Sequence, residues 1–494
     1  GDLMPELLTL ENFQAAHRHY HIYRIHSTTM ADMAHYHDYY QVCYVVSGEI
    51  LHKQSADWTA RFTTDSHLYR QNSIHCVNLG QGFKEPIIWW QQGKEDRHLN
   101  APKEALRRIP HTFGFPTGLW AGDELTHFGD PTRGSELCTA TEMMYSLEEV
   151  YRITGDNTYA DLLERVTYNA LPTQITDDGN TRQYYHQINQ VEVTRKQRNF
   201  STPHEDTDIL FGILTGYPCC TCNLHQAWPK FVQNLWLKTA EGGIAAMVYA
   251  PSKLSTTLAS GARVEIHEQT CYPFEEQIRF SFSMPERKHR SAAFPFELRI
   301  PEWSDKYTLT VNGESINADE IRKGTIRLNR TWSDGDDVIL TLNAPVRTTS
   351  WYDRAAVIER GPLVYALRME ENWQKHICEG DDKVQLGEYY YEVTSTTPWN
   401  VALMGADLND DKIQQSFIVE KGACSDKPWS LESAPIKIKA KGRILPEWTM
   451  NRNSAGDFCY YTQQAPEGEV GEEVDIELIP FGCTTLRVTE FPVR

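Results

Sequence analysis

The chain has 494 residues, which is enough for two or three domains that each bury a core. Its formal net charge of −19 excludes a typical nucleic-acid-binding protein, because that binding depends on lysine and arginine neutralising phosphate. No run of about 18 apolar residues occurs, so the sequence predicts no membrane span.

The 11 cysteines are odd in number and mostly scattered, which is not typical of a disulfide framework. The first residues, 1–8, are typical of the middle of a helical domain, so we expect a processed or truncated chain. The sequence leaves the compartment open and allows a homodimer.

Residues 1–240 mostly show the hydrophobic spacing of helices. Two helix–turn–helix patterns, over 87–109 and 142–171, turn near Gly93 and Gly155. Repeated helical hairpins predict an α/α toroid that is short at its N-terminal side, and we expect this region to be the catalytic domain.

One segment of this region, 35–49, is rich in β formers and could be a strand of cupin type. His35 and His37 could then bind a metal ion, or they could be surface or core histidines.

Three cysteines fall within four positions, at Cys219, Cys220 and Cys222. The apolar spacing that follows predicts a helix over 224–237 with Asn223 as its N-cap. The thiols would then lie at or just before a helix N-terminus, where unpaired N–H groups favour thiolates. Thiolates bind Zn²⁺ and react with electrophiles.

A second helix is predicted to begin at Ser135 as its N-cap, which places Glu136 and Cys138 in the first turn. Together with Cys219 and Cys220, these residues supply one carboxylate and three thiolates. That set suits tetrahedral Zn²⁺.

The residues alone leave three interpretations of the cysteines open. A zinc site could staple two helices together, or it could take part in catalysis. Cys219 and Cys222 also form a C-x-x-C motif, so a thioredoxin-like redox pair is the third interpretation, although helices rather than a βαβ unit surround it.

Several polar residues near these motifs are ambiguous by themselves. Asp123 and Glu124 could be solvated loop acids, His75 could be a core histidine, and 184–190 could be an ordinary strand or loop.

After residue 241 the apolar spacing changes to two, which predicts antiparallel β-sandwiches over 241–370 and 371–494. Within them, 311–313 and 334–336 are predicted hairpin turns, and 380–382 lies in a loop-rich stretch. The predicted fold class is therefore α+β and multidomain, with a helical toroid followed by two β-sandwich domains.

The motif order Gly-Asp-Glu at 122–124, Gly-Ser-Glu-Leu-Cys at 134–138 and Cys-Cys-x-x-Asn at 219–223 resembles glycoside hydrolase family 127, the β-L-arabinofuranosidase-like group. The resemblance runs from about residue 55 through the β domains and includes the closing segment 480–487. It implies an (α/α)6 barrel followed by β-sandwich domains.

The resemblance also implies roles for individual residues. Cys219 would be the nucleophile and Glu124 the general acid/base, while His75, Tyr185 and Asp123 would contact the substrate. The implied Zn²⁺ ligands are Glu136, Cys138, Cys219 and Cys220.

The implied reaction is the retaining hydrolysis of β-L-arabinofuranosides, or of a related pentose glycoside, in plant glycans. Glu124 would protonate the leaving oxygen while Cys219 attacks the anomeric carbon, and water activated by Glu124 would then release the sugar. The partner would be an oligosaccharide or glycoconjugate substrate. The alternative is a non-catalytic, zinc-stapled carbohydrate-binding relative.

Overall fold

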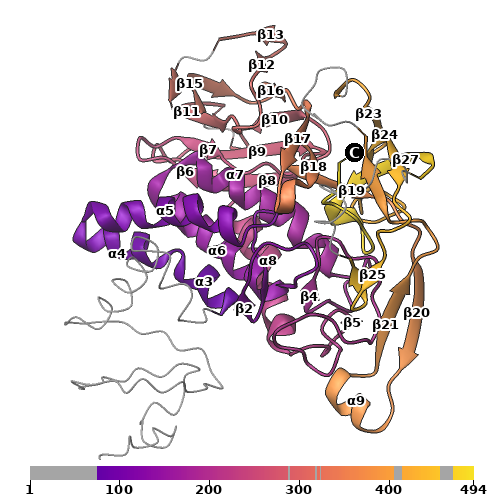
Figure 1. The fold of residues 1–494 in the computed structure, drawn as a ribbon. Helices are drawn as coiled ribbons and strands as arrows, with labels where there is room; N and C mark the ends of the chain where they lie inside the picture. The colour runs from indigo at the N-terminus through magenta and orange to yellow at the C-terminus, as the bar shows by residue number, and fades with distance from the viewer. Residues whose placement is uncertain are drawn as a thin grey trace, which may run out of the picture. The chain divides into compact units, whose positions relative to one another are not determined.

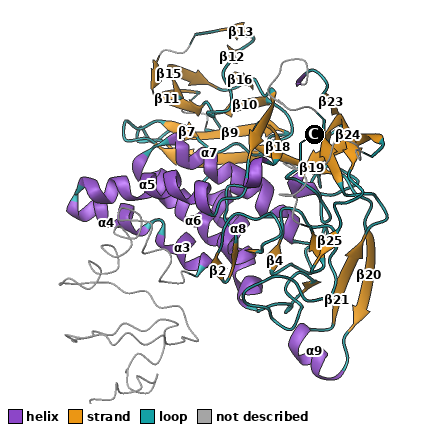
Figure 2. Cartoon of the chain, in the orientation of Figure 1, coloured by secondary structure: helices purple, strands orange, loops and turns teal. Residues whose placement is uncertain are grey.

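The computed structural model describes residues 75–286, 290–317, 320–322, 324–404, 414–456 and 471–493. The predicted β segment with His35 and His37 lies outside the described residues. Within these ranges the chain is a mixture of helices and many strands (Figure 1), and Figure 2 shows the two kinds of element separately. None of the helices in these ranges combines the length and apolar character needed to cross a membrane.

Most helices lie before residue 234, and both predicted helix–turn–helix pairs are confirmed, as α4–α5 and α6–α7. Gly155 ends α6 in the left-handed conformation, with a φ of 63°. The helices are α3 Cys76–Gly82, α4 Glu85–Gly93, α5 Asp96–Thr112, α6 Leu137–Thr154, α7 Asn157–Arg165, the π-helical turn η2 Val166–Ala170, the 3₁₀ turn η3 Pro172–Gln174 and α8 Cys219–Gln233.

The predicted N-cap of α6 was wrong. Ser135 lies in strand β3, Ser135–Glu136, and its hydroxyl donates to the carbonyl of Trp120 at 3.1 Å. Glu136 takes the cap position instead, with extended backbone angles. Strand pairing therefore moves the helix start one residue along the chain.

The predicted N-cap of α8 was also wrong. This helix begins at Cys219, directly after Pro218, so Asn223 lies inside it. The cysteines of the cluster therefore lie in the first turn of α8 rather than before it.

A small sheet lies beside these helix starts, with strand order β2-β1-β3-β4. Its parallel pairing of Gly122 with Ser135 puts the two acidic motifs of the sequence next to each other. The strands are β1 Gly122–Asp123, β2 Leu125–Thr126, β3 and β4 Tyr185–His186.

Two larger sheets follow, a six-stranded one in the order β13-β12-β16-β10-β9-β8 and a five-stranded one in the order β14-β15-β11-β7-β6. Buried rings join them: Phe282 of β10 stacks on Trp332 of β15 with ring centroids 4.5 Å apart. The strands are β6 Trp236–Lys238, β7 Ile244–Ala246, β8 Ser252–Thr257, β9 Arg263–Thr270, β10 Gln277–Ser283, β11 Ser291–Arg299, β12 Tyr307–Val311, β13 Glu314–Ser315, β14 Glu320–Arg322, β15 Thr325–Ser333 and β16 Asp337–Leu342.

One of the two predicted hairpin turns is confirmed. Asn312 and Gly313 both have positive φ, 52° and 82°, and join the paired strands β12 and β13. The prediction for 334–336 was wrong, because β15 and β16 lie in different sheets and this turn crosses between them.

The last large sheet has seven strands, three from before residue 370 and four from after it. Their order is β17-β18-β19-β27-β24-β22, with β23 paired to β24. The three-domain division of the sequence stays a prediction. The strands are β17 Val346–Ser350, β18 Ala356–Arg360, β19 Leu363–Leu367, β22 Val401–Leu403, β23 Ile418–Lys421, β24 Ile436–Ile444 and β27 Glu473–Pro480.

The residues Gly380 to Asp382 open a short helix, so the loop prediction there was wrong. This helix, α9 Gly380–Leu386, lies at the end of the hairpin of β20 and β21 (Figure 1). The remaining elements are β5 Phe211–Gly212, β20 Asn372–Ile377, β21 Tyr389–Thr394, β25 Met450–Asn451, β26 Ser454–Ala455 and the 3₁₀ turns η4 Tyr352–Arg354 and η5 Phe481–Cys483.

A buried ionic cluster ties the helices to the sheets. The guanidinium of Arg299, at the end of β11, is fully buried, pairs with Asp161 and Glu164 of α7, and donates to the carbonyl of Met247 at 2.6 Å. Because the carboxylates would be left buried without a partner, loss of this arginine would cost about 3–5 kcal/mol.

One disulfide joins Cys271, after β9, to Cys424, after β23. The scattered cysteine pattern did not predict this bond. The free cysteines among the described residues are Cys76, Cys138, Cys219, Cys220, Cys222, Cys378 and Cys483.

A buried acid connects the two helices that carry the sequence motifs. Glu148 of α6 accepts a hydrogen bond from the side-chain amide of Asn234, at the end of α8, at 3.0 Å. Burial raises the pKa of Glu148 to about 8. Since this lies above the unfolded value of about 4.3, the folded state is favoured while Glu148 keeps its proton, and stability falls as the pH rises from about 4 to 8.

We predict that Glu148→Gln raises the free energy of unfolding at pH 8 by about 2 kcal/mol and changes it far less at pH 5, because glutamine resembles the protonated acid. Urea unfolding at both pH values measures this. Glu149→Gln, which removes only a surface pair with Arg152, is the control and should change stability by less than about 1 kcal/mol. Equal effects of Glu148→Gln at both pH values would contradict the prediction.

Candidate functional site

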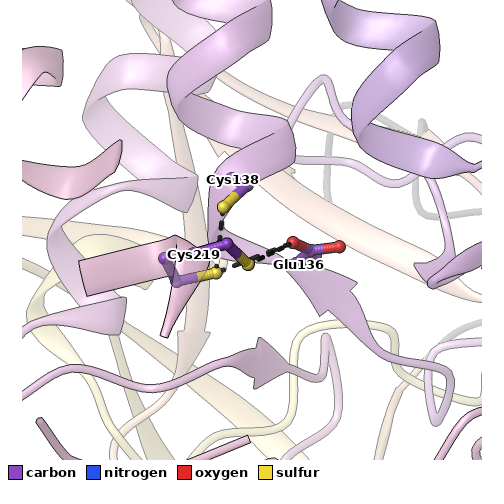
Figure 3. Close-up of side chains that lie close together, drawn as sticks. Glu136, Cys138 and Cys219 are labelled. Carbon is purple, nitrogen blue, oxygen red and sulfur yellow. Dashed lines mark hydrogen bonds between the residues drawn. The ribbon is translucent and has the colours of Figure 1, made fainter. Parts of the chain in front are cut away.

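Four side chains from the starts of α6 and α8 meet at one point, and Figure 3 shows Glu136, Cys138 and Cys219 directed toward one another. The sulfurs of Cys138 and Cys220 are 3.2 Å apart. Glu136 Oε1 lies 3.6 Å from Cys219 Sγ and 3.7 Å from Cys220 Sγ. The predicted proximity of these two parts of the sequence is therefore confirmed.

This donor set fits a thiophilic divalent cation. All four donor atoms lie within 4.8 Å of one another. Zn–S bonds of about 2.3 Å in a tetrahedron would place neighbouring sulfurs about 3.8 Å apart, whereas the sulfurs of Cys138 and Cys220 lie 3.2 Å apart, so these two would have to separate slightly around an ion. The four residues can thus hold a metal ion.

The protonation states of the group depend on burial. Burial raises the pKa of the thiols of Cys138 and Cys220 well above the ordinary value, and it raises the pKa of Glu136 to about 8. Hydrogen bonds from the thiols of Cys138 and Cys220 instead lower the pKa of Cys219. The protein alone therefore favours one thiolate, and a bound cation would be needed to ionise the other groups.

The four side chains differ in their exposure. Glu136, Cys138 and Cys220 are buried, whereas Cys219 is half-buried. Cys222, the other half of the C-x-x-C motif, is exposed and does not belong to the group. Of the three thiols in the group, that of Cys219 is thus the one that a solute can reach.

A fourth thiol touches this group from the side. Cys76 Sγ lies 3.4 Å from Glu136 Oε2, and His75, Cys76 and Glu136 form a second set of potential ligands within 4.8 Å. Both ring nitrogens of His75 are already engaged, Nδ1 with the N–H of Val77 at 3.2 Å and Nε2 with Glu124 at 2.6 Å. We therefore assign Cys76 to orienting the carboxylate of Glu136.

Glu124 lies at the tip of the β1–β2 connection in an unusual backbone conformation. Its φ is 72°, in the left-handed region that residues other than glycine rarely adopt. The amide of Cys76 donates to the carbonyl of Glu124 at 2.7 Å and helps to hold this conformation. Such strain is often found at functional sites.

Three side chains surround the carboxylate of Glu124. Oε1 accepts hydrogen bonds from the hydroxyls of Tyr184 at 2.5 Å and Tyr185 at 3.2 Å, and Oε2 contacts His75. The same Tyr184 hydroxyl lies 3.8 Å from Cys219 Sγ. One tyrosine therefore contacts both Glu124 and the half-buried sulfur.

Hydrogen bonding sets the charge of Glu124. Burial would raise its pKa, but hydrogen bonds from His75 and Tyr184 outweigh burial, so the pKa of Glu124 lies below its ordinary value. Because Nδ1 of His75 accepts from the Val77 amide, Nε2 carries the proton that is donated to Glu124. Without a ligand, Glu124 is a carboxylate.

Asp123 points away from this arrangement. It is fully buried, and its carboxylate contacts His127 at 2.5 Å and Arg133 at 3.6 Å. Asp123 is the last residue of β1, whereas Glu124 follows it in the turn with a left-handed backbone, so the two side chains have different surroundings. The predicted substrate contacts of Asp123, His75 and Tyr185 stay predictions.

Arg182 fixes the loop that leads into α8. Its buried guanidinium donates to the carbonyls of Thr215 and Tyr217, at 2.5 Å and 2.9 Å, and to the hydroxyl of Thr221 at 3.0 Å. This set of bonds holds the approach to Cys219.

Several residues of the site were not predicted from the sequence. Tyr184 lies in the segment 184–190, whose role the sequence leaves ambiguous, and Cys76 is not part of any predicted motif. His204 and Asp208, whose Nδ1 and Oδ1 atoms are 2.5 Å apart, were missed. Their spacing of four residues was the available signal, but no motif connected them to Glu124.

The residues of this site lie within a segment that matches a known protein family. Residues 75–233 match the family model described as the catalytic domain of β-L-arabinofuranosidase of family GH127, and 243–344 match the model of its middle domain. The chain is 24% identical over 332 residues to a non-reducing end β-L-arabinofuranosidase of Bifidobacterium longum subsp. longum, covering 64% of this chain and 48% of that protein. It thus spans about half the length of this curated relative.

Solved structures share the fold. A GH127 β-L-arabinofuranosidase from Geobacillus stearothermophilus T6 superposes with a TM-score of 0.61 at 18% identity, covering 89% of this chain and 66% of that one. A structure titled glycoside hydrolase gives a TM-score of 0.62 at 19% identity, covering 90% of this chain and 72% of that one.

We predict that the purified chain binds one equivalent of Zn²⁺ and that Cys138→Ser lowers the affinity at least tenfold, because a thiolate ligand is lost. Competition with a chromophoric chelator measures the affinity. Cys222→Ser, in the first turn of α8 beside two of the potential ligands but outside the group, is the control and should bind like the wild type. Equal losses in both variants would contradict the assignment.

Proposed function

Since the chain belongs to glycoside hydrolase family 127, we propose that it is a zinc-dependent retaining glycosidase with a cysteine nucleophile. Its substrates would be β-L-arabinofuranosides, or a related pentose glycoside, in plant glycans. The partner is then an oligosaccharide or glycoconjugate.

One observation carries this proposal: the Tyr184 hydroxyl contacts both Glu124 and Cys219. Its distances of 2.5 Å and 3.8 Å keep Glu124 Oε1 within about 6 Å of Cys219 Sγ, near the separation of about 5 Å between the two carboxyls of ordinary retaining glycosidases. Glu124 and Cys219 can therefore act on the same glycosidic bond.

Glu124 and Cys219 have different roles in the proposed reaction. Glu124 donates a proton to the leaving oxygen while Cys219 Sγ attacks the anomeric carbon, forming a thioglycosyl bond as the C–O bond breaks. Glu124, again a carboxylate, then takes a proton from water, which displaces the sulfur and releases the sugar with retained configuration. A bound sugar that excludes water from Glu124 raises its pKa, as the first step requires.

Glu136, Cys138, Cys219 and Cys220 would hold Zn²⁺, which would keep the sulfurs deprotonated at neutral pH. Around them, the chain itself supplies the positioning: Cys76 orients Glu136, and Arg182 holds the loop before Cys219.

For the substrate contacts, we propose that His75 and Tyr185 line the sugar pocket beside Glu124. We propose that Asp123 acts on this pocket through its contact with His127. For the fold, we propose an (α/α)6-barrel-like toroid over 1–240 and β-sandwich domains over 241–370 and 371–494. The helical hairpins α4–α5 and α6–α7 support the first part and the ring contacts between the two larger sheets support the second, whereas the seven-stranded sheet takes strands from both sides of residue 370.

We predict that Cys219→Ser lowers kcat at least about 10³-fold, because a hydroxyl is a far weaker nucleophile than a thiolate, while most of the bound zinc remains. Activity on 4-nitrophenyl β-L-arabinofuranoside and metal analysis of the same sample measure both quantities. Full activity in this variant would exclude Cys219 as the nucleophile. A wild-type chain that holds zinc and binds sugar but releases no aglycone would instead favour the zinc-stapled carbohydrate-binding alternative.

We predict that Glu124→Gln slows an alkyl glycoside at least about 10²-fold more than an activated aryl glycoside, because a poor leaving group needs the proton more. Steady-state rates for the two glycosides measure the difference in the first step. His111→Gln, at the end of α5 and outside the site, is the control and should affect neither rate. Equal slowing of both glycosides by Glu124→Gln would argue for a structural role of this residue.

A further inference from the structure

His204 is held rigidly next to the proposed acid/base. Its Nδ1 lies 2.5 Å from Asp208 Oδ1, and its backbone N–H donates to the same carboxylate at 3.0 Å from Oδ2. The backbone carbonyl of Asp208 also accepts from the amides of Tyr184 and Tyr185, at 3.1 Å and 2.9 Å. The buried Asp208 therefore fixes His204 against the strand that carries both tyrosines.

The other ring nitrogen of His204 is left for a ligand. Nε2 lies 3.7 Å from Glu124 Oε1, which is longer than a hydrogen bond, and the described part of the chain offers it no hydrogen bond. The ring is partly exposed and packs edge-on against Tyr184 with centroids 5.1 Å apart. A polar atom with a fixed direction thus faces the space beside Glu124.

An exposed aromatic ring continues this surface. Tyr217 directly precedes Pro218 and Cys219, and 52% of its surface is exposed although Arg182 pins its backbone carbonyl. The rings of Tyr217 and His204 have centroids 6.1 Å apart. Its position is therefore fixed by the backbone while its face stays open, which suits stacking on the C–H face of a sugar ring.

We infer that His204 and Tyr217 form the subsite for the leaving group, and that this subsite takes a second sugar ring. The inference rests on the proposed function, because the residue that protonates the leaving oxygen marks the leaving-group side of the bond. His204 Nε2 forms a hydrogen bond with a hydroxyl of that second ring, and Tyr217 stacks on the face of the ring. The chain is then selective for arabinofuranosyl disaccharides over glycosides with small leaving groups.

Two substrates that differ only in the leaving group test this inference: a β-L-arabinofuranosyl disaccharide and methyl β-L-arabinofuranoside. Tyr217→Ala should lower kcat/KM for the disaccharide about tenfold, mainly through KM, and His204→Gln should lower it at least as much. Tyr217→Ala should stay within about twofold of the wild type on the methyl glycoside. Tyr217→Phe keeps the ring face and should restore the disaccharide value.

Val232→Ala, an exposed position near the other end of α8, is the control and should leave both substrates unchanged. Equal losses on the two substrates in Tyr217→Ala would overturn the inference.

Binding of the intact disaccharide to the Cys219→Ser chain, measured by calorimetry, separates the subsite from the chemistry. Adding Tyr217→Ala to this background should weaken the Kd about tenfold, and an unchanged Kd would overturn the subsite. If the wild-type chain cleaves neither substrate, the proposed function fails, while the binding comparison still decides the subsite.

Discussion

The gathering of one carboxyl and three thiols in a single small volume, with all but Cys219 buried, is the constraint on which the rest of the structure depends. Cys138 and Cys220 come from positions 82 residues apart, so the volume exists only while α6 and α8 stay packed. The hydrogen bond between Glu148 and Asn234 joins these helices at their far ends. Because burial disfavours charge on most of these groups, a cation would change their protonation together rather than one at a time.

The short strands beside the helix starts bring further polar side chains next to this group. The parallel pairing of β1 with β3 places the Glu124 turn beside Glu136, and the antiparallel pairing of β3 with β4 adds Tyr184 and Tyr185. Glu136 and the turn that carries Glu124 therefore lie on one small sheet, and the Tyr184 hydroxyl contacts both Glu124 and Cys219. The left-handed conformation of Glu124 aims its carboxylate at this hydroxyl, whereas Asp123 points into the protein.

Much of the metal group could be predicted because its members occur in two tight pairs with an unusual composition. The boundaries of the helices were harder to predict from the sequence. Ser135 is a typical N-cap residue, but pairing with Gly122 and His186 makes its backbone part of a strand. Two similar Gly-containing turns also have different outcomes: the turn at 312–313 joins paired strands, whereas the turn at 334–336 crosses between two sheets. The turn residues alone do not distinguish these cases, because the partners of the flanking strands are distant in sequence. His204 was missed for the same reason, because its role comes from contacts made only in the folded chain.

The bond between Cys271 and Cys424 has a consequence for how the protein matures. A disulfide persists in an oxidising environment, and there the sulfurs of Cys138 and Cys220, 3.2 Å apart, are exposed to the same oxidants while the chain folds. Coordination would shield them from being joined to each other. For a chain that binds a cation here, the order of events would matter: an ion bound before oxidation would protect the two sulfurs, whereas a chain oxidised first would lose two of its four potential ligands.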